Sequence, residues 1–341
     1  MSETYSIGSV TSVHKSHAND ISLKDYDLVL ATATWETRGE LFFTKFTKSS
    51  LKKSNVSIFY FRSMNGDTTK RKEKFLEFLE SKLGKKPRIW ELDRSIDVDS
   101  NFAKIKSRIS DLRKSLKRPV NILCDISCLP KSYILYLIGL SFNGEFGSRL
   151  TLFYAEAEKY EMKKGKRFSS RSNLMSSGDW QLVLIPYFEP DDLITEGSEL
   201  LLSLGAEIKA CIAMIERIEP KSLRVSTISH FTEKIPKNVA KREVPFLKSI
   251  AQNYGANISE FELCAVHPLT RWIDLNCNST TQSLIIGPKL HAVGIAIAAL
   301  SKSNVQINCR IPNSYSLTNV APSGEIHTVD IIDRFDPRNY M

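Results

Sequence analysis

The sequence predicts an α/β protein made of two tandem Rossmann-like units, each with a doubly wound, mainly parallel sheet, related by internal duplication. Three observations lead to this prediction. Apolar, β-branched runs alternate with helical segments along the chain, as they do in βαβ crossovers. The order of these segments in residues 23–178 recurs in residues 197–341. A Pro-Lys pair opens an apolar stretch of helical length in each half, in LPKSYILYLIGL and in GPKLHAVGIAIAAL.

The first half contains five strand-like runs separated by helical ones. The runs are rich in Val, Ile, Leu, Phe and Tyr, which favours buried strands, and we expect strands at 26–36, 56–62, 88–93, 120–127 and 150–158. Helical spacing of apolar side chains indicates helices at 37–51, 70–84 and 101–118, and a further helix after LPK. Gly84 and Pro119 are natural ends for the second and third of these helices.

The second half repeats the order of the first. Residues 199–218 correspond to the first strand and helix, 223–229 to the second strand, and 243–255 to the helix with a terminal glycine. Residues 257–263, 283–300 and 305–315 then match the remaining elements, and the last of these ends on Tyr315 as its counterpart ends on Tyr160. We therefore expect a polar N-terminal segment at 1–22, units at 23–178 and 197–341, and a linker at 179–196.

Composition sets limits on the class of protein. The 341 residues are 42% hydrophobic and 25% charged, as in water-soluble globular proteins, and their number is typical of two domains. The sequence has no apolar run near the roughly 20 residues that cross a bilayer, and its first residues do not resemble a signal peptide, so we expect a cytoplasmic protein without a membrane partner. The six cysteines lack zinc-site spacing and are expected to be reduced and mostly buried.

The formal charge of +9 favours an anionic partner. Lysine and arginine cluster in the first half, at 47–54, 68–75, 104–118 and 158–171. Such runs suit nucleic acid, a nucleotide or an acidic partner, although most basic runs are simply solvated helix faces.

Candidate ligand-binding residues stand where strands end and helices begin, because open parallel sheets bind ligands at the carboxyl ends of their strands. In each half two junctions qualify. The first follows the first strand, and the second contains the Pro-Lys pair. The residues are Thr34, Glu36 and Arg38 with their counterparts Glu207 and Lys209, and Asp125, Ser127, Lys131 and Ser132 with their counterparts Gly287, Lys289 and His291.

The Pro-Lys junctions are suited to an anion such as phosphate. Proline is favourable at a helix start, where the free N–H groups and the partial positive charge attract anions. Neither copy is a P-loop, and in each the lysine is alternatively just an exposed residue of a first turn. Structural roles are the alternative to ligand binding for other candidates. Asp125 is then a helix cap, His291 a packed core histidine, and Glu36 and Arg38 an ion pair. No catalytic set, metal site or cofactor motif is recognised, so enzymatic activity is left open.

The segments DISCLPKSYILYLIGL with LTLFYAEAEKY, and IIGPKLHAVGIAIAAL with VQINCRIPNSY, resemble CRISPR-associated Rossmann-fold (CARF) domains. That family has a Gly-Gly-Thr-Lys-like turn that opens an apolar helix rich in small residues. Here the first copy lacks the turn glycines, and proline precedes the lysine in both. The resemblance implies a cyclic oligonucleotide or similar nucleotide held between the two units, facing Lys131, Lys289 and the loops at 32–38 and 203–209. Because the two units fill the chain, any effector is expected to be a separate protein.

Several functions therefore remain open. The first is a nucleotide sensor or accessory subunit of a prokaryotic antiviral defence system. A second is a metal-independent phosphodiesterase of the ring-nuclease kind that cleaves the ligand. A third is a subunit that binds nucleic acid through the basic first half, or that serves as a scaffold.

Overall fold

The computed structural model describes residues 2–16, 21–62, 66–160, 176–189, 198–205, 208–229, 237–315 and 320–336. The chain divides into two compact units. Unit 1 comprises residues 1–168 and 317–341, and unit 2 comprises residues 169–316. Among the described helices, none is long and apolar enough to cross a membrane.

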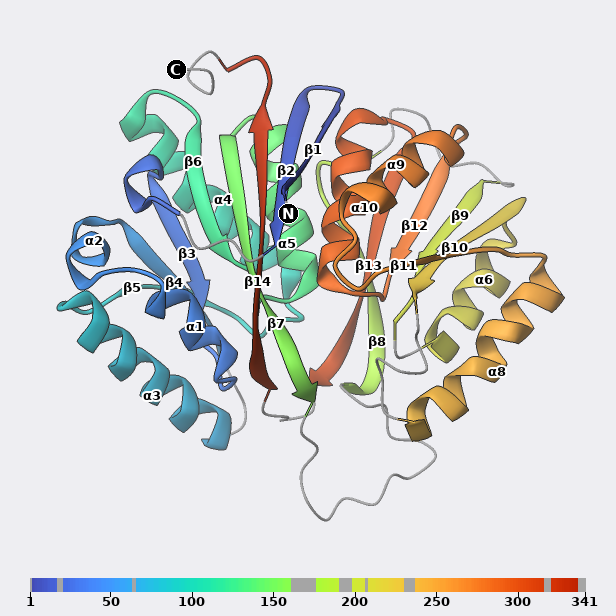
Figure 1. The fold of residues 1–341 in the computed structure, drawn as a ribbon, viewed down its shortest axis with the longest axis horizontal. Coiled ribbons are helices and arrows are strands. Elements are labelled where there is room, and N and C mark those ends of the chain that lie inside the picture. The colour runs from blue at the N-terminus through green and yellow to red at the C-terminus, as the bar shows by residue number, and fades with distance from the viewer. Residues whose placement is uncertain are drawn as a thin grey trace. The chain divides into compact units, whose positions relative to one another are not determined.

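Unit 1 is built on an eight-stranded sheet in the order β1-β2-β14-β7-β6-β3-β4-β5 (Figure 1). Its five neighbouring parallel strands are β3 (Leu28–Thr32), β4 (Val56–Phe61), β5 (Arg88–Leu92), β6 (Val120–Asp125) and β7 (Gly147–Tyr160). Three antiparallel strands extend the sheet beyond β7: β14 (Val320–Asp333), β2 (Val10–Ser16) and β1 (Ser2–Ile7).

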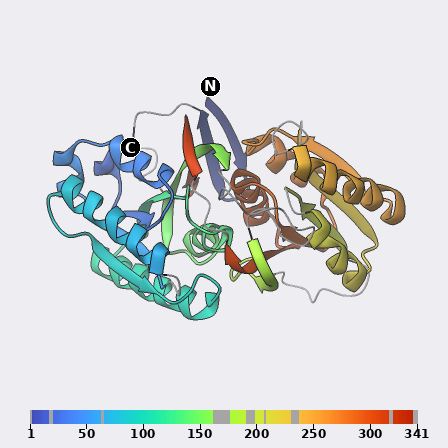
Figure 2. The ribbon, with the colours of Figure 1, turned by 90° about the horizontal axis from the view of Figure 1, so that it is seen from below.

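Helices cover both faces of the sheet of unit 1 (Figure 2). On one face α1 (Arg38–Thr44), α2 (Lys48–Lys53) and α3 (Gly66–Leu83) bury a phenylalanine-rich core that includes Phe42, Phe43 and Phe75. On the other face α4 (Val98–Leu116) packs against α5 (Lys131–Phe142), where the rings of Phe102 and Tyr136 stack with their centroids 4.0 Å apart. Helix α5 is apolar on all sides and buried along most of its length, as the sequence indicates.

Unit 2 has a six-stranded sheet in the order β11-β10-β9-β12-β13-β8. The parallel strands are β9 (Glu199–Ser203), β10 (Ser222–Ile228), β11 (Asn257–Phe261), β12 (Thr281–Ile285) and β13 (Val305–Tyr315), and β8 (Ser176–Leu184) is antiparallel to β13. The 3-10 helix η2 (Ile208–Cys211), α6 (Ile212–Ile218) and α8 (Lys237–Tyr254) share one core. Helices α9 (His267–Asn276) and α10 (Lys289–Ser301) pack against each other. At this contact the Thr270 hydroxyl of α9 donates to the carbonyl of Gly294 of α10 over 3.0 Å.

The two sheets confirm the predicted α/β class and the repeated order. Counted from the strand antiparallel to the rest (β14 in unit 1, β8 in unit 2) to the opposite edge, β14-β7-β6-β3-β4-β5 corresponds strand for strand to β8-β13-β12-β9-β10-β11. In each unit the order of the parallel strands reverses between the first and the fourth, as in doubly wound folds. The sequence did not predict α9, which takes the place that α4 has in unit 1.

The unit boundaries differ from those expected from the sequence, because the sixth strands are exchanged. Strand β8 follows β7 along the chain but pairs with β13, and β14 follows β13 but pairs with β7 (Figure 1). Residues 176–184, most of which were expected in the linker at 179–196, are therefore part of the sheet of unit 2, and residues 317–341 belong to unit 1. The polar N-terminal segment expected at 1–22 is part of unit 1, since β1 and β2 form a hairpin on β14. The sequence predicted no strand at β8, β14, β1 or β2, and hydrophobic pattern alone does not show which sheet edge a strand joins.

Candidate functional site

The predicted ligand loops lie at the carboxyl ends of neighbouring strands in both units. In unit 1 β3 and β6 pair directly, and the chain passes from β3 to α1 on one face and from β6 to α5 on the other. In unit 2 β9 and β12 pair in the same way, with Ser203 opposite Ile285. Each pair of loops thus flanks the point at which strand order reverses, where open α/β sheets bind their ligands.

An ion pair holds the first loop of unit 1. The Nε of Arg38 donates to Oε2 of Glu36 over 2.6 Å, and the Arg38 side chain is only 5% exposed. The backbone N–H of Glu36 donates to the Thr34 hydroxyl over 3.1 Å. Because the two charges compensate each other, we interpret Glu36 and Arg38 as residues that shape the loop, which is the alternative that the sequence left open for them.

Gly39 lets the two loops of unit 1 approach closely. A Cβ at this position would lie 2.4 Å from Cγ2 of Thr34 and 3.5 Å from Sγ of Cys128. The Cys128 thiol itself donates to Oε2 of Glu36 over 3.7 Å. The loop after β3 and the loop after β6 are therefore in direct contact through small or flexible side chains.

Asp125 and Ser127 brace the second loop instead of facing outward. The backbone N–H and the hydroxyl of Ser127 both donate to Oδ1 of Asp125, over 2.9 and 2.5 Å. The Ser127 hydroxyl accepts from the N–H of Ala155 in β7 over 2.9 Å. Both side chains are buried, with Asp125 at 3% exposure. These hydrogen bonds complete the turn that leads into α5, and the binding of a ligand by Asp125 and Ser127 stays a prediction.

The start of α5 keeps the features expected of an anion site. Pro130 precedes the helix in extended conformation, and no side chain caps the helix. Lys131 is the first helical residue and is partly exposed. The hydroxyl of Ser132 is buried, with 1% exposure of the residue, and has no hydrogen-bond partner among the described residues. An uncompensated buried hydroxyl is costly, so its place beside a helix start favours a ligand there.

A buried polar network fixes the orientation of this helix start. The Tyr133 hydroxyl donates to the carbonyl of Ser95 over 3.0 Å and accepts from Nδ2 of Asn101 over 2.8 Å. The Asn101 side chain is fully buried, and its Oδ1 accepts from the N–H of Asp93 over 2.7 Å. Burial raises the pKa of Tyr133 well above its usual value, so its hydroxyl stays protonated. The first turn of α5 is therefore rigidly placed relative to the end of β5.

The equivalent junction of unit 2 is closed by its own backbone. The N–H groups of Ile286 and Gly287 both donate to the carbonyl of Ser203, over 2.9 and 2.7 Å. A Cβ on Gly287 would lie 2.4 Å from the Ser203 Oγ, which is buried and lacks a partner in the described part of the chain. Gly287 thus allows the two loops to pack closely, and its contact with a ligand stays a prediction. Lys289 begins α10 behind Pro288, again without a side-chain cap.

The remaining candidates of unit 2 are buried or fall outside the described residues. His291 is fully buried, and its Nε2 lies 2.8 Å from the carbonyl of Glu262, to which it donates. Burial lowers the pKa of His291, so the ring is neutral. His291 is therefore the packed core histidine that the sequence left as an alternative. Glu207 lies outside the described residues, and the side chains of Lys209, Tyr160 and Tyr315 do too.

Sequence reasoning missed a buried lysine near the same edge of unit 1. Lys72 of α3 is 3% exposed, and its Nζ donates to the carbonyl of Phe61, the last residue of β4, over 2.6 Å. Burial lowers its pKa to about 8. A basic run such as 68–75 is normally a solvated helix face, but Lys72 precedes the inward-facing Phe75 and Leu79 at helical spacing, and this spacing predicts that Lys72 also faces inward.

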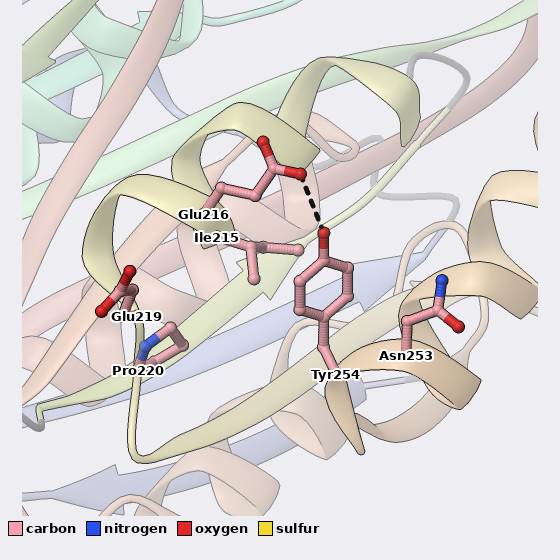
Figure 3. A pocket seen from close by; sticks show the side chains of 6 residues that line it. All are labelled: Ile215, Glu216, Glu219, Pro220, Asn253 and Tyr254. Atoms are coloured by element: carbon pink, nitrogen blue, oxygen red, sulfur yellow. Dashed lines mark hydrogen bonds between the residues drawn. The ribbon is translucent and has the colours of Figure 1, made fainter.

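The surface pocket of unit 2 shown in Figure 3 lies elsewhere. It has a volume of about 480 Å³ and is lined by Ile215, Glu216, Glu219, Pro220, Asn253 and Tyr254. These residues come from the ends of α6 and α8, which lead into the amino ends of β10 and β11. The Tyr254 hydroxyl donates to Oε1 of Glu216 over 3.1 Å. Two carboxylates make this pocket unsuitable for an anion.

Comparison with known proteins leaves the chain without an assigned family. It matches no protein family and no curated protein. Similar solved structures include the cytoplasmic domain of a prokaryotic cation chloride cotransporter, with 10% identity over 84% of this chain and 95% of that one and a TM-score of 0.24. They also include a universal stress protein from Archaeoglobus fulgidus, with 9% identity over 83% of this chain and 95% of that one and a TM-score of 0.22. At these scores neither likeness bears on function.

Proposed function

We propose that the chain is a nucleotide-binding protein whose ligand places a phosphate group at the start of α5 in unit 1. The observation that carries the proposal is the first turn of α5, where Lys131 stands beside the buried Ser132 hydroxyl. Within the described part of the chain no side chain caps this helix, and the Ser132 hydroxyl has no hydrogen-bond partner. Free N–H groups, a cation and a hydroxyl donor at one helix start form a suitable environment for phosphate. Lys289 at the start of α10 is the equivalent cation of unit 2.

The wider role is that of a sensor or accessory subunit of a prokaryotic antiviral defence system, acting in the cytoplasm. The CARF-like turns support this role, and the ligand that they imply is a cyclic oligonucleotide or a related nucleotide. Two further points stay predictions of the sequence. One is that the two units share one ligand, and the other is that a separate effector protein responds to it. Cleavage of the ligand is the alternative activity, and chromatography of the bound nucleotide after incubation addresses it.

Nucleic-acid binding through the basic helix α4 is less well supported. Its cations have partners within unit 1: Lys104 Nζ donates to Oδ2 of Asp93 over 2.6 Å, and the Arg108 guanidinium lies 5.8 Å from the ring centroid of Trp90. Arg113 lies 5.3 Å from the ring centroid of Phe146. These contacts account for part of the basic run by local packing.

Thermal denaturation in the presence of a panel of linear and cyclic nucleotides tests the proposal. A specific ligand at 100 times its dissociation constant stabilises the folded state by about 2.7 kcal/mol. We expect one class of nucleotide to raise the melting temperature, and Lys131→Ala to reduce this shift. Lys114→Ala removes the same charge from an exposed position at the far end of α4 and serves as the matched control. The proposal is overturned if no nucleotide stabilises the protein, or if both variants lose the shift equally.

A further inference from the structure

Lys72 is a buried cation whose charge is not compensated by a carboxylate among the described residues. Its Nζ contacts one carbonyl oxygen, that of Phe61, and lies 5.3 Å from the ring centroid of Tyr60 and 6.0 Å from that of Trp35. Aromatic faces attract an ammonium group, but this attraction is weaker than the cost of removing the ammonium from water. A buried charge left in this state is typical of functional sites.

The position of Lys72 joins it to the proposed site. Phe61, its hydrogen-bond partner, is the last residue of β4 at the carboxyl edge of the sheet, and β4 neighbours β3. Trp35 belongs to the loop after β3, one residue before Glu36. The indole Nε1 of Trp35 is buried and has no hydrogen-bond acceptor among the described residues. The Lys72 ammonium and the Trp35 indole N–H are therefore two donors at one corner of unit 1. Among the described residues, the Phe61 carbonyl is the only hydrogen-bond acceptor of either group.

Unit 2 carries the opposite charge at the equivalent place. Helices α3 and α8 have the same length, and each is followed by a glycine with positive φ, Gly84 and Gly255. Counted back from these glycines, Lys72 corresponds to Glu243, which is 2% exposed. The match in packing supports this alignment, because Leu79 and Ile250 are then equivalent and both are fully buried in the cores of their units. One buried helical position is thus a cation in unit 1 and a carboxylate in unit 2.

We propose that Lys72, together with the indole N–H of Trp35, binds an anionic phosphate group of the ligand, and that unit 1 alone has this second anion subsite. The inference rests on the proposed function and extends it to a ligand with more than one phosphate group. The anion reaches the ammonium when the partly exposed Trp35 side chain rotates, a movement that keeps its indole N–H beside the anion. Glu243 would repel an anion from the same corner of unit 2, so the duplicated units have diverged into one that binds this group and one that does not.

Calorimetric titration of the full chain with inorganic pyrophosphate tests the inference. We expect Lys72→Met to weaken binding at least tenfold, and Lys74→Met, which removes an exposed lysine from the same helix, to change it less than twofold. Glu243→Gln should leave affinity unchanged, and the stoichiometry at this subsite should be one per chain. Equal binding by wild type and Lys72→Met overturns the inference while the proposed function stands. A wild type that binds neither pyrophosphate nor any nucleotide overturns both.

The pH profile of wild-type binding is a second test that needs no variant. Among the described residues, the groups that face the Lys72 ammonium are the Phe61 carbonyl, the Trp35 indole and the Tyr60 phenol. Burial together with Glu73 and Glu91 raises the pKa of Tyr60, which stays neutral through pH 9. Pyrophosphate gains charge as pH rises, so a subsite of ordinary lysines would hold its affinity to pH 9. We expect affinity to fall at least threefold between pH 7 and pH 9, and a constant or rising affinity contradicts the inference.

Discussion

Arg149 of β7 and Asp330 of β14 form a bidentate ion pair although they are 181 residues apart. The Arg149 Nη2 donates to Oδ2 of Asp330 over 2.7 Å, and the Arg149 Nε donates to Oδ1 over 3.0 Å. The Thr151 hydroxyl also donates to Oδ1 of Asp330 over 2.7 Å, and the Tyr26 hydroxyl lies 2.8 Å from that of Thr151. Burial is the main reason that the pKa of Tyr26 is raised to about 12, so the phenol remains a neutral member of this network. The network fixes the last strand of the chain in unit 1.

Breaking this pair should destabilise unit 1. We expect Asp330→Ala to lower the free energy of unfolding by about 2 kcal/mol, between the values for exposed and for buried ion pairs, because Arg149 and Asp330 are partly exposed. Urea denaturation measures the change, and Asp111→Ala at an exposed site of α4 is the control. Equal stability of the two variants would show that the network does not hold β14.

The exchange of strands predicts which fragments fold. Residues 169–316 include every strand of the sheet of unit 2, whereas residues 197–341 lack β8 and carry β14 without its neighbours β7 and β2. We therefore expect the first fragment to unfold cooperatively in urea and the second to show a broad transition or aggregation, since unpaired strand edges promote association. Cooperative unfolding of 197–341 alone would argue for the boundaries that the sequence suggests.

Lys72 should make stability depend on alkaline pH. Its pKa in the folded protein, about 8, lies below the ordinary 10.5, so the folded state loses this proton before the unfolded chain does. Unfolding then takes up a proton between these values, and stability rises with pH across that window, by about 3 kcal/mol for this group.

The difference in unfolding free energy between wild type and Lys72→Met isolates this effect, because the other titrating groups cancel. We expect Lys72→Met to be at least as stable as wild type at pH 7, where the buried charge is costly. That advantage should shrink between pH 8 and pH 10. A difference that is independent of pH would mean that the Lys72 ammonium is solvated in the folded protein.

Gly287 should be required for packing in unit 2. Gly287→Ala places a methyl group against the Ser203 hydroxyl and the Leu204 carbonyl, and we expect a loss of 1–3 kcal/mol, as is typical of overpacking. Combining it with Ser203→Ala removes the closest contact, so the double variant should recover part of the loss. Thermal denaturation of the single and double variants gives the coupling, and strict additivity would contradict the close contact of the two loops.

The sequence predicts the repeated fold well because hydrophobic periodicity and helix ends are local signals. The helices before Gly84 and Gly255 end within one residue of their expected ends, although they begin four and six residues earlier than expected. The strands β8 and β14 and their pairing were not predicted, because the partner of an edge strand is set by contacts between residues distant in sequence, such as Arg149 with Asp330.

The candidate site was predictable in place but not in detail. Both pairs of loops lie where the alternation of strands and helices puts them. Whether a polar residue turns outward or braces a loop depends on neighbours distant in sequence, as for Ser127 with Ala155 and His291 with Glu262. The burial of Lys72 was not predicted, because a charged residue within a basic run is normally solvated.

The most direct test of the central claim is a crystal structure of the full chain with the nucleotide that gives the largest thermal stabilisation. We expect a phosphate oxygen within about 3 Å of the backbone N–H or hydroxyl of Ser132 and of the Lys131 ammonium, the distance of charge-assisted hydrogen bonds. A nucleotide bound away from the start of α5, for example in the Glu216–Tyr254 pocket of unit 2, would contradict the account.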